Sequence, residues 1–178
     1  MCNFLPLMLL TVSIPWAKWL LAAMLLAYFP MMAVLILGLR RVARSTRLPD
    51  ADCVPVTVIV SARNEERDFP RCIAALRALD YPAGKLQIVL VNDHSDDRTG
   101  EIIAAAAAED SRVVAMDAAA LPRNGLEAKA RGIAHGFTRA TGEWVFITDA
   151  DASVHPQWLR QMLGRVTPQT GMVAGAVE

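Results

Sequence analysis

The stretch Glu143-Trp-Val-Phe-Ile-Thr-Asp-Ala-Asp151 is a run of apolar and β-branched residues that ends in two carboxylates one residue apart. Such a run predicts a buried strand, Trp144 to Thr148, with Asp149 and Asp151 at its carboxyl end. On an extended segment the two side chains point the same way, so they can chelate one cation directly or through water. Carboxylates suit Mg²⁺ or Mn²⁺, and a diphosphate would complete the shell. Because Asp is also common where a strand turns into a loop, the pair alone is a weak signal.

Strands and helices alternate on both sides of this stretch. In chain order, the sequence predicts strands at 54–61, 86–91, 112–116, 144–148 and 172–177, and helices at 68–79, 99–108, 128–140 and 154–166. Alternation at these lengths predicts an α/β fold with a mostly parallel, Rossmann-type sheet and flanking helices.

Polar clusters follow three of the predicted strands: Arg63-Asn64-Glu65, Asn92-Asp93 and Asp149-Ala-Asp151. In parallel α/β sheets, ligands bind at the carboxyl ends of the strands, so the three clusters together indicate a ligand site. Asp93 can accept a hydrogen bond from a base N–H or a ribose hydroxyl. The alternative is that Asp93 forms an Asx-turn or caps the next helix.

Two basic residues lie near the start of the helix predicted at 128–140. Lys129 can face a diphosphate as a mobile charge, Arg131 is nearby, and spacing alone does not choose between them. The alternative is that these basic side chains are simply solvated and bind no ligand. The sequence contains neither GxxxxGK[ST] nor a strand-linked GxGxxG, which argues against a P-loop or dinucleotide-binding domain. A nucleotide site here must therefore use carboxylates and a metal.

The N-terminal part of the chain is strongly apolar. Residues 20–39 are uncharged and long enough to span a bilayer, with Trp16 and Trp19 before them and a basic segment, 40–47, after them. The positive-inside rule places the basic end, and everything after it, in the cytoplasm. The apolar stretch 4–16 is short for a span, so the anchor is either single-pass or a hairpin. A cleaved signal peptide is disfavoured because no basic n-region and no A-x-A site flank the apolar run.

Composition gives three expected regions: a membrane segment at 1–44, a linker at 45–53 and a globular domain at 54–178. Residues 1–49 carry five basic and no acidic residues, whereas the remainder carries 13 basic and 18 acidic residues. A slightly acidic domain argues against nucleic acid as a partner. The three isolated cysteines suggest neither a zinc site nor a disulfide framework, which fits a reducing compartment.

In four segments the sequence resembles the family 2 glycosyltransferases of the GT-A fold. These segments are Val58–Glu66, Val89–Thr99, Ala128–Gly136 and Gly142–Asp151, and they are similar to the family's P-x-x-N-E, D-D-x-S-x-D-x-T, G-K-x-x-A-L-x-x-G and G-E-x-x-x-x-x-D-A-D patterns in order and spacing. The likeness covers about 54–178. The sequence departs from the patterns at Ser61, Asn92, Ala128 and Gly132-Ile133, where the family often has Pro, an acid, Gly and Ala-Leu.

The resemblance implies a nucleotide-sugar site. Its expected residues are Ser61, Glu65, Asp93, Lys129, Asp149 and Asp151. Of these, Ser61 and Glu65 would lie near the base and ribose, and Asp93 would contact the base, usually uracil. Lys129, rather than Arg131, would contact the diphosphate. Asp149 and Asp151 would hold the ribose and the metal.

The resemblance also implies an activity. It is the metal-dependent, inverting transfer of a sugar from a nucleotide-diphospho-sugar, with a UDP-sugar as the expected donor, to a lipid or polysaccharide acceptor at the cytoplasmic (inner) membrane. The family's catalytic base is a carboxylate well after the DxD motif. No catalytic base is identified in this sequence, and one is expected beyond Glu178, with the acceptor half of the enzyme. The alternative is a truncated fragment that binds nucleotide, or is inactive, without transferase activity.

Overall fold

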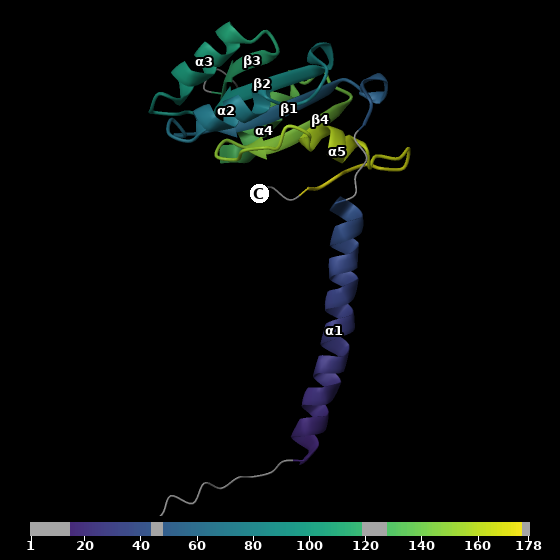
Figure 1. Cartoon of the computed structure of the whole chain (residues 1–178). Coiled ribbons are helices and arrows are strands. Elements are labelled where there is room, and N and C mark those ends of the chain that lie inside the picture. The colour runs from purple at the N-terminus through teal and green to yellow at the C-terminus, as the bar shows by residue number, and fades with distance from the viewer. Residues whose placement is uncertain (1–14, 44–47, 119–127, 176–178) are drawn as a thin grey trace, which may run out of the picture. The chain divides into compact units, whose positions relative to one another are not determined.

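The structure, a computed structural model, describes residues 15–43, 48–118 and 128–175 (Figure 1). The chain divides into two compact units, Met1–Ser45 and Thr46–Glu178. Apart from its last two residues, the apolar stretch predicted at 4–16 lies outside the described residues.

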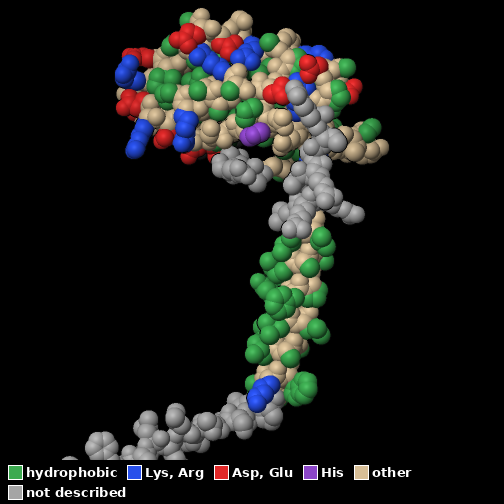
Figure 2. Space-filling model, in the orientation of Figure 1, with side chains coloured by type: hydrophobic (Ala, Val, Ile, Leu, Met, Phe, Trp, Pro, Cys, Tyr) green, Lys and Arg blue, Asp and Glu red, His purple; other side chains and the backbone are tan. Residues whose placement is uncertain are grey.

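The first unit contains one long helix, α1 (Pro15–Ala43), which includes the predicted span and continues through Pro30. Its segment Trp16–Gly38 has a mean hydropathy of 2.5 and is long and apolar enough to cross a membrane. Large apolar side chains, among them Trp19 and Leu26, are exposed along it (Figure 2). An apolar surface on every side of a helix fits hydrocarbon surroundings better than water.

The second unit is built on a four-stranded sheet in the order β3-β2-β1-β4. The strands are β1 (Val56–Ala62), β2 (Leu86–Asn92), β3 (Val113–Asp117) and β4 (Trp144–Asp149). All three neighbouring pairs are parallel, which confirms the predicted mostly parallel sheet. β1 lies inside the sheet and is buried along almost its whole length, as an uninterrupted β-branched strand should be.

Helices cover both faces of the sheet (Figure 1). Alternate residues of β1 point to opposite faces, so Val58 and Ile59 belong to different apolar cores. The Val58 core includes residues of α2 (Phe69–Arg77), α3 (Thr99–Glu109) and α5 (Trp158–Leu163). On the other face, α4 (Ala128–Phe137) packs so closely that a Cβ atom on Gly136 would overlap Ile59.

Two predictions about the last part of the chain are wrong. The helix predicted at 154–166 is only the short α5, because Pro156 disfavours helical backbone at His155. No strand forms in the described residues of the predicted segment 172–177, and 176–178 lie outside the described residues. Gly171 precedes this segment and Gly175 lies within it, and glycine is a poor strand former.

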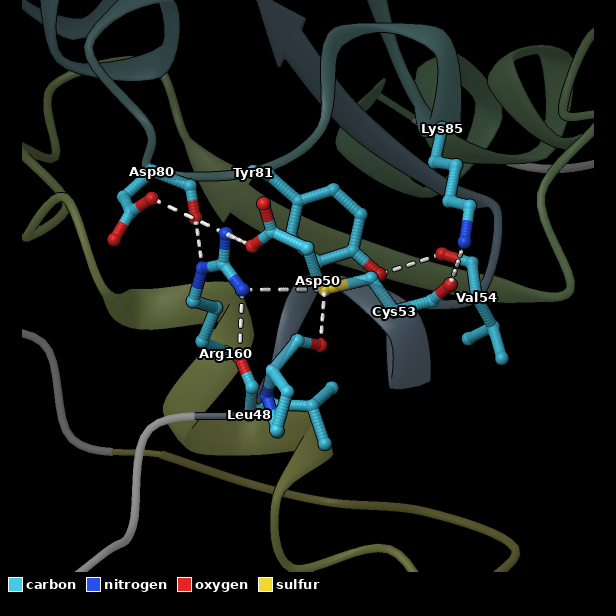
Figure 3. Close-up of polar contacts among 9 residues, drawn as sticks. Leu48, Asp50, Cys53, Val54, Asp80, Tyr81, Lys85 and Arg160 are labelled. Atoms are coloured by element: carbon cyan, nitrogen blue, oxygen red, sulfur yellow. Dashed lines mark hydrogen bonds and ion pairs between the residues drawn. The ribbon is translucent and has the colours of Figure 1, made fainter.

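Arg160 of α5 joins parts of the second unit that lie far apart in the sequence (Figure 3). Its buried guanidinium donates to Leu48 O (2.6 Å), to Asp80 O (2.6 Å) and to the carboxylates of Asp50 (2.5 Å) and Asp80 (3.2 Å). It also reaches Cys53 Sγ at 3.4 Å. One side chain therefore fastens the segment before β1 to α5 and to the loop after α2.

Neighbouring side chains reinforce this arrangement. Tyr81 Oη donates to Val54 O at 2.5 Å, and Lys85 Nζ donates to Cys53 O at 2.6 Å (Figure 3). The Tyr81 ring also lies 6.0 Å from the Arg160 guanidinium, within the range of a cation–π contact. The start of β1 is thus held by side chains from three later segments.

Candidate functional site

A cavity of about 310 Å³ opens at the carboxyl edge of the sheet. It is lined by Ser61, Arg63, Glu65, Asp93, Lys129, Asp149, Ala150 and Asp151. All the residues that the sequence predicts for a nucleotide-sugar site therefore lie around one space. Arg63 and Ala150 also line it; both belong to the polar clusters predicted to mark a ligand site, but neither was given an individual role.

The strand register explains why these residues meet. Ser61 of β1 pairs with Asp149 of β4, and Ala62 pairs with Asn92 of β2. The three strands thus end level with one another, and Asp93 N–H donates to Ala62 O at 2.8 Å. Residues that follow parallel strands at the same level must share one edge of the sheet.

Hydrogen bonds join the loops that follow β1 and β2. Asn64 N–H donates to Ser95 Oγ (3.1 Å), Glu65 N–H donates to Thr99 Oγ1 (2.9 Å), and Asp96 N–H donates to Asn64 Oδ1 (2.8 Å). Asn64 itself has φ 57°, a left-handed backbone that asparagine adopts more readily than most residues. These bonds fix the place of Glu65 on the cavity wall.

Asp93 lines the cavity and is almost fully buried. Its Oδ1 accepts from Arg131 Nη2 at 2.6 Å and lies 3.1 Å from His94 Nδ1. Burial raises the pKa of Asp93, but the hydrogen bonds from Arg131 and His94 outweigh burial, so the net pKa lies below its usual value. Of the two basic residues that spacing left open, Lys129 lines the cavity and Arg131 holds Asp93 from behind.

Asp149 and Asp151 do not lie on one extended segment. β4 ends at Asp149, and Ala150 and Asp151 form a turn in which Ala152 N–H donates to Asp149 O at 3.2 Å. The prediction of an extended pair is therefore wrong, because the strand has no ladder partner beyond Ser61. Both residues nevertheless line the cavity, where Lys129 Nζ forms an ion pair with Asp149 Oδ1.

The cavity carries an excess of negative charge. Partial burial raises the pKa of Glu65, and repulsion from Asp151, Asp68, Asp97 and Asp149 raises it further. Within the described ranges there is no group of three His, Cys, Asp or Glu side chains that could hold a metal by themselves. Two carboxylates in an acidic cavity still fit Mg²⁺ or Mn²⁺, which are often bound by one or two carboxylates plus phosphates and water.

Sequence reasoning missed two groups of residues around the cavity. Arg63 belongs to the polar cluster after β1, and no described residue forms an ion pair or hydrogen bond with its side chain. Arg71 and Cys72 of α2 donate to the backbone of the Asp149–Asp151 turn. The sequence gave a signal for Arg63 in that cluster. It gave none for the α2 residues, which are 80 and 77 positions from their partners.

Ser61 and Gly132 touch, and both depart from the family pattern described above. A Cβ atom on Gly132 would overlap Ser61 Oγ and lie 2.9 Å from Ser61 Cβ. We expect Gly132→Ala to lower the free energy of unfolding by about 1–3 kcal/mol, the usual cost of overpacking a tight contact. Thermal unfolding of the full chain in detergent micelles measures this change.

The control for this prediction is Gly84→Ala, because a Cβ atom at Gly84 meets nothing within 4 Å. The double variant Gly132→Ala/Ser61→Gly removes the overlap and should recover most of the lost stability. If Gly132→Ala is more stable than the unmodified chain, the preference of alanine for a helix is unopposed, and α4 does not pack against β1 as tightly as described.

Comparisons with known proteins agree with this fold. The model of glycosyl transferase family 2 matches residues 57–178. The succinoglycan biosynthesis protein ExoO of Rhizobium meliloti is 32% identical over 127 residues, which are 71% of this chain and 34% of ExoO. The undecaprenyl-phosphate 4-deoxy-4-formamido-L-arabinose transferase of Pseudomonas aeruginosa is 33% identical over 111 residues, which are 62% of this chain and 32% of that enzyme. The chain thus spans about a third of the length of these relatives.

A solved structure shares the fold. The mannosyltransferase PcManGT of Pyrobaculum calidifontis, in complex with GDP-Man and Mn²⁺, superposes with a TM-score of 0.59 and 26% identity over 84% of this chain and 44% of its own. This likeness confirms the GT-A-like fold, and the family match extends over most of the chain. The chain belongs to glycosyl transferase family 2.

Proposed function

We propose that this chain binds a nucleoside-diphosphate sugar, most favourably a UDP-sugar, and that a longer polypeptide containing it transfers the sugar to a membrane acceptor. The observation that carries the proposal is the cavity of about 310 Å³ at the carboxyl edge of the sheet. Around this cavity lie Asp93, which can accept a hydrogen bond from a base, and Lys129, which can pair with a phosphate. Asp149 and Asp151, which can hold a metal, also line it. Membership of the family supports the same reading.

In this proposal Asp93 recognises the nucleotide base by accepting a hydrogen bond from it. Its Oδ1 is occupied by Arg131 and His94, and no described residue donates to its Oδ2. A carboxylate only accepts, so the base must present an N–H, as uracil does at N3. Guanine also presents an N–H, whereas cytosine presents an acceptor at the equivalent nitrogen and is disfavoured.

Lys129, Asp149 and Asp151 hold the diphosphate end. Lys129 is long and half-exposed, so it can turn from Asp149 to a phosphate oxygen. Asp149 and Asp151 would hold Mg²⁺ or Mn²⁺, which, when bound, neutralises charge on the leaving diphosphate. Ser61 and Glu65 lie beside the base and ribose. The Mn²⁺ in the related mannosyltransferase structure supports a divalent ion in this role.

The acceptor is a lipid or polysaccharide at the cytoplasmic face of the inner membrane. Three features support this: the apolar α1, the basic segment after it, and the names of two relatives, which refer to undecaprenyl phosphate and to succinoglycan. The regions 1–44, 45–53 and 54–178 serve as anchor, linker and donor-binding domain. Inverting transfer needs a base that deprotonates the acceptor hydroxyl, and we expect that base beyond Glu178.

Two measurements on the full chain in detergent micelles test this proposal. Calorimetry with UDP and Mn²⁺, repeated with GDP and CDP, should show binding that weakens in the order UDP, GDP, CDP. Absence of binding to all three would reject a nucleotide site. Transfer of labelled sugar from a UDP-sugar to a membrane extract would distinguish an active transferase from a fragment that only binds nucleotide.

Asp93→Asn should weaken UDP binding roughly 10–100-fold, because a hydrogen bond to a charged group contributes about 1.5–3 kcal/mol. Asp96→Asn is the matched control, since Asp96 is exposed and its side chain does not line the cavity. Calorimetry at pH 7 compares the two variants. Equal UDP affinity in both would mean that Asp93 only braces the loop.

A further inference from the structure

Two consecutive residues of α2 hold the backbone of the turn that carries Asp149 and Asp151. Arg71 Nη2 donates to Asp151 O at 2.8 Å, and Cys72 Sγ donates to Asp149 O at 3.5 Å. Neither Arg71 nor Cys72 lines the cavity. They contact the turn through its carbonyl oxygens and leave both carboxylates free to face the cavity.

The turn has few other hydrogen bonds in the described part of the chain. The β1–β4 ladder ends at the pair Ser61 and Asp149. Beyond it, the hydrogen bond from Ala152 N–H to Asp149 O is local to the turn, and Asp151 O accepts a bond from Arg71. Ala150 and Val154 pack into the apolar core on either side of this peptide. Among the described residues, however, Arg71 makes the one hydrogen bond from outside the turn that reaches the carbonyl oxygen of Asp151.

We propose that Arg71 is a positioning residue that orients the Asp149–Asp151 turn for cation binding, with Cys72 as a second support behind Asp149. This inference rests on the proposed function for its chemistry. Two carboxylates bind one cation well only when their oxygens are held at a suitable separation and direction. A hydrogen bond to the carbonyl of Asp151 fixes its peptide plane, and so restricts where its side chain can point.

The charge of Arg71 acts in the opposite direction. A guanidinium near the turn repels a divalent cation, so loss of its charge alone would tighten cation binding slightly, since exposed charges interact weakly. Positioning predicts the reverse sign: removal of Arg71 should weaken cation binding. The sign of the change therefore separates the two effects.

The test is calorimetry of the full chain in detergent micelles with UDP, at increasing Mn²⁺ and in EDTA. Arg71→Ala should raise the Mn²⁺ concentration for half-maximal enhancement roughly 3–10-fold, as expected for one lost hydrogen bond. UDP affinity in EDTA should not change. Arg71→Lys retains a donor and should recover part of the loss. Arg67→Ala is the charge control, because Arg67 is exposed and its side chain forms no hydrogen bond or ion pair with a described residue.

Hydrogen exchange of the peptide that covers 144–155 provides a readout that does not need nucleotide. Arg71→Ala should speed exchange of the amides at 150–152, and Arg67→Ala should not. Unchanged exchange, unchanged Mn²⁺ dependence or tighter Mn²⁺ binding in Arg71→Ala would overturn the inference. If the unmodified chain binds no nucleotide, the proposed function fails, and exchange alone then decides whether Arg71 holds the turn.

Discussion

Asp151→Ala should abolish the Mn²⁺-dependent part of UDP binding, with a loss of roughly 100-fold or more in affinity. Even residues that only support a metal ligand affect metal affinity 10–100-fold, and Asp151 is expected to be a direct ligand. The cavity offers few replacements, because within the described ranges no group of three potential ligands exists. Calorimetry with UDP, in Mn²⁺ and then in EDTA, measures the metal-dependent and the metal-independent contributions to UDP affinity.

The EDTA measurement is the internal control for Asp151→Ala. Without metal, the variant should bind UDP at least as tightly as the unmodified chain, because Asp93 and Lys129 remain and one negative charge near the diphosphate is removed. Asp68→Ala is the external control: Asp68 contributes negative charge near Glu65 but does not line the cavity. If Asp151→Ala binds UDP as well as Asp68→Ala does in Mn²⁺, the metal assignment to the Asp149–Asp151 turn is wrong.

The sequence predicted the sheet, and the cavity residues that follow its strands, for one physical reason. A buried parallel strand requires a continuous apolar run, and the residue after it must emerge at the ligand-binding edge. Val58–Ser61, Leu86–Val91 and Trp144–Thr148 each have such a run. Asp93 and Asp149 could therefore be placed at the same edge without any knowledge of which strands are neighbours.

Contacts between distant segments could not be predicted in this way. The bonds from Arg71 to Asp151 and from Arg160 to Leu48 join residues 80 and 112 positions apart. Neither arginine stands in a motif, and an arginine on a helix is usually solvated. The prediction of an extended Asp149–Asp151 segment failed for the same reason. The backbone turns after Asp149 because its pairing with distant β1 ends there.

Sequence spacing alone also could not show which of Lys129 and Arg131 lines the cavity. Both stand near the start of α4, two positions apart, so they point in different directions from a helix. Arg131 faces the sheet and pairs with buried Asp93, whereas Lys129 faces the cavity. The resemblance to the family chose Lys129, and the position of Lys129 on the cavity wall supports that choice.

Arg160→Ala should lower the free energy of unfolding of the second unit by about 3–5 kcal/mol, because each acceptor left without its donor costs about 1–3 kcal/mol and a buried side chain is lost. The variant leaves the carbonyl oxygens of Leu48 and Asp80 without the donor that each has now. For a domain of this size, the melting temperature should fall by roughly 10–20 °C. Near-UV circular dichroism of the full chain in detergent micelles follows this transition.

Asp50→Ala separates the contribution of the carbonyl contacts from that of the ion pair. The Asp50 side chain is 77% exposed, whereas that of Arg160 is 3% exposed. An exposed carboxylate contributes little even when it is paired, so Asp50→Ala should cost under about 1 kcal/mol. Arg160→Lys should remain strongly destabilised, because a lysine ammonium cannot supply donors in the fixed directions of a guanidinium. Equal destabilisation by Asp50→Ala and Arg160→Ala would show instead that the ion pair, and not the bonds to Leu48 and Asp80, fastens the segment before β1.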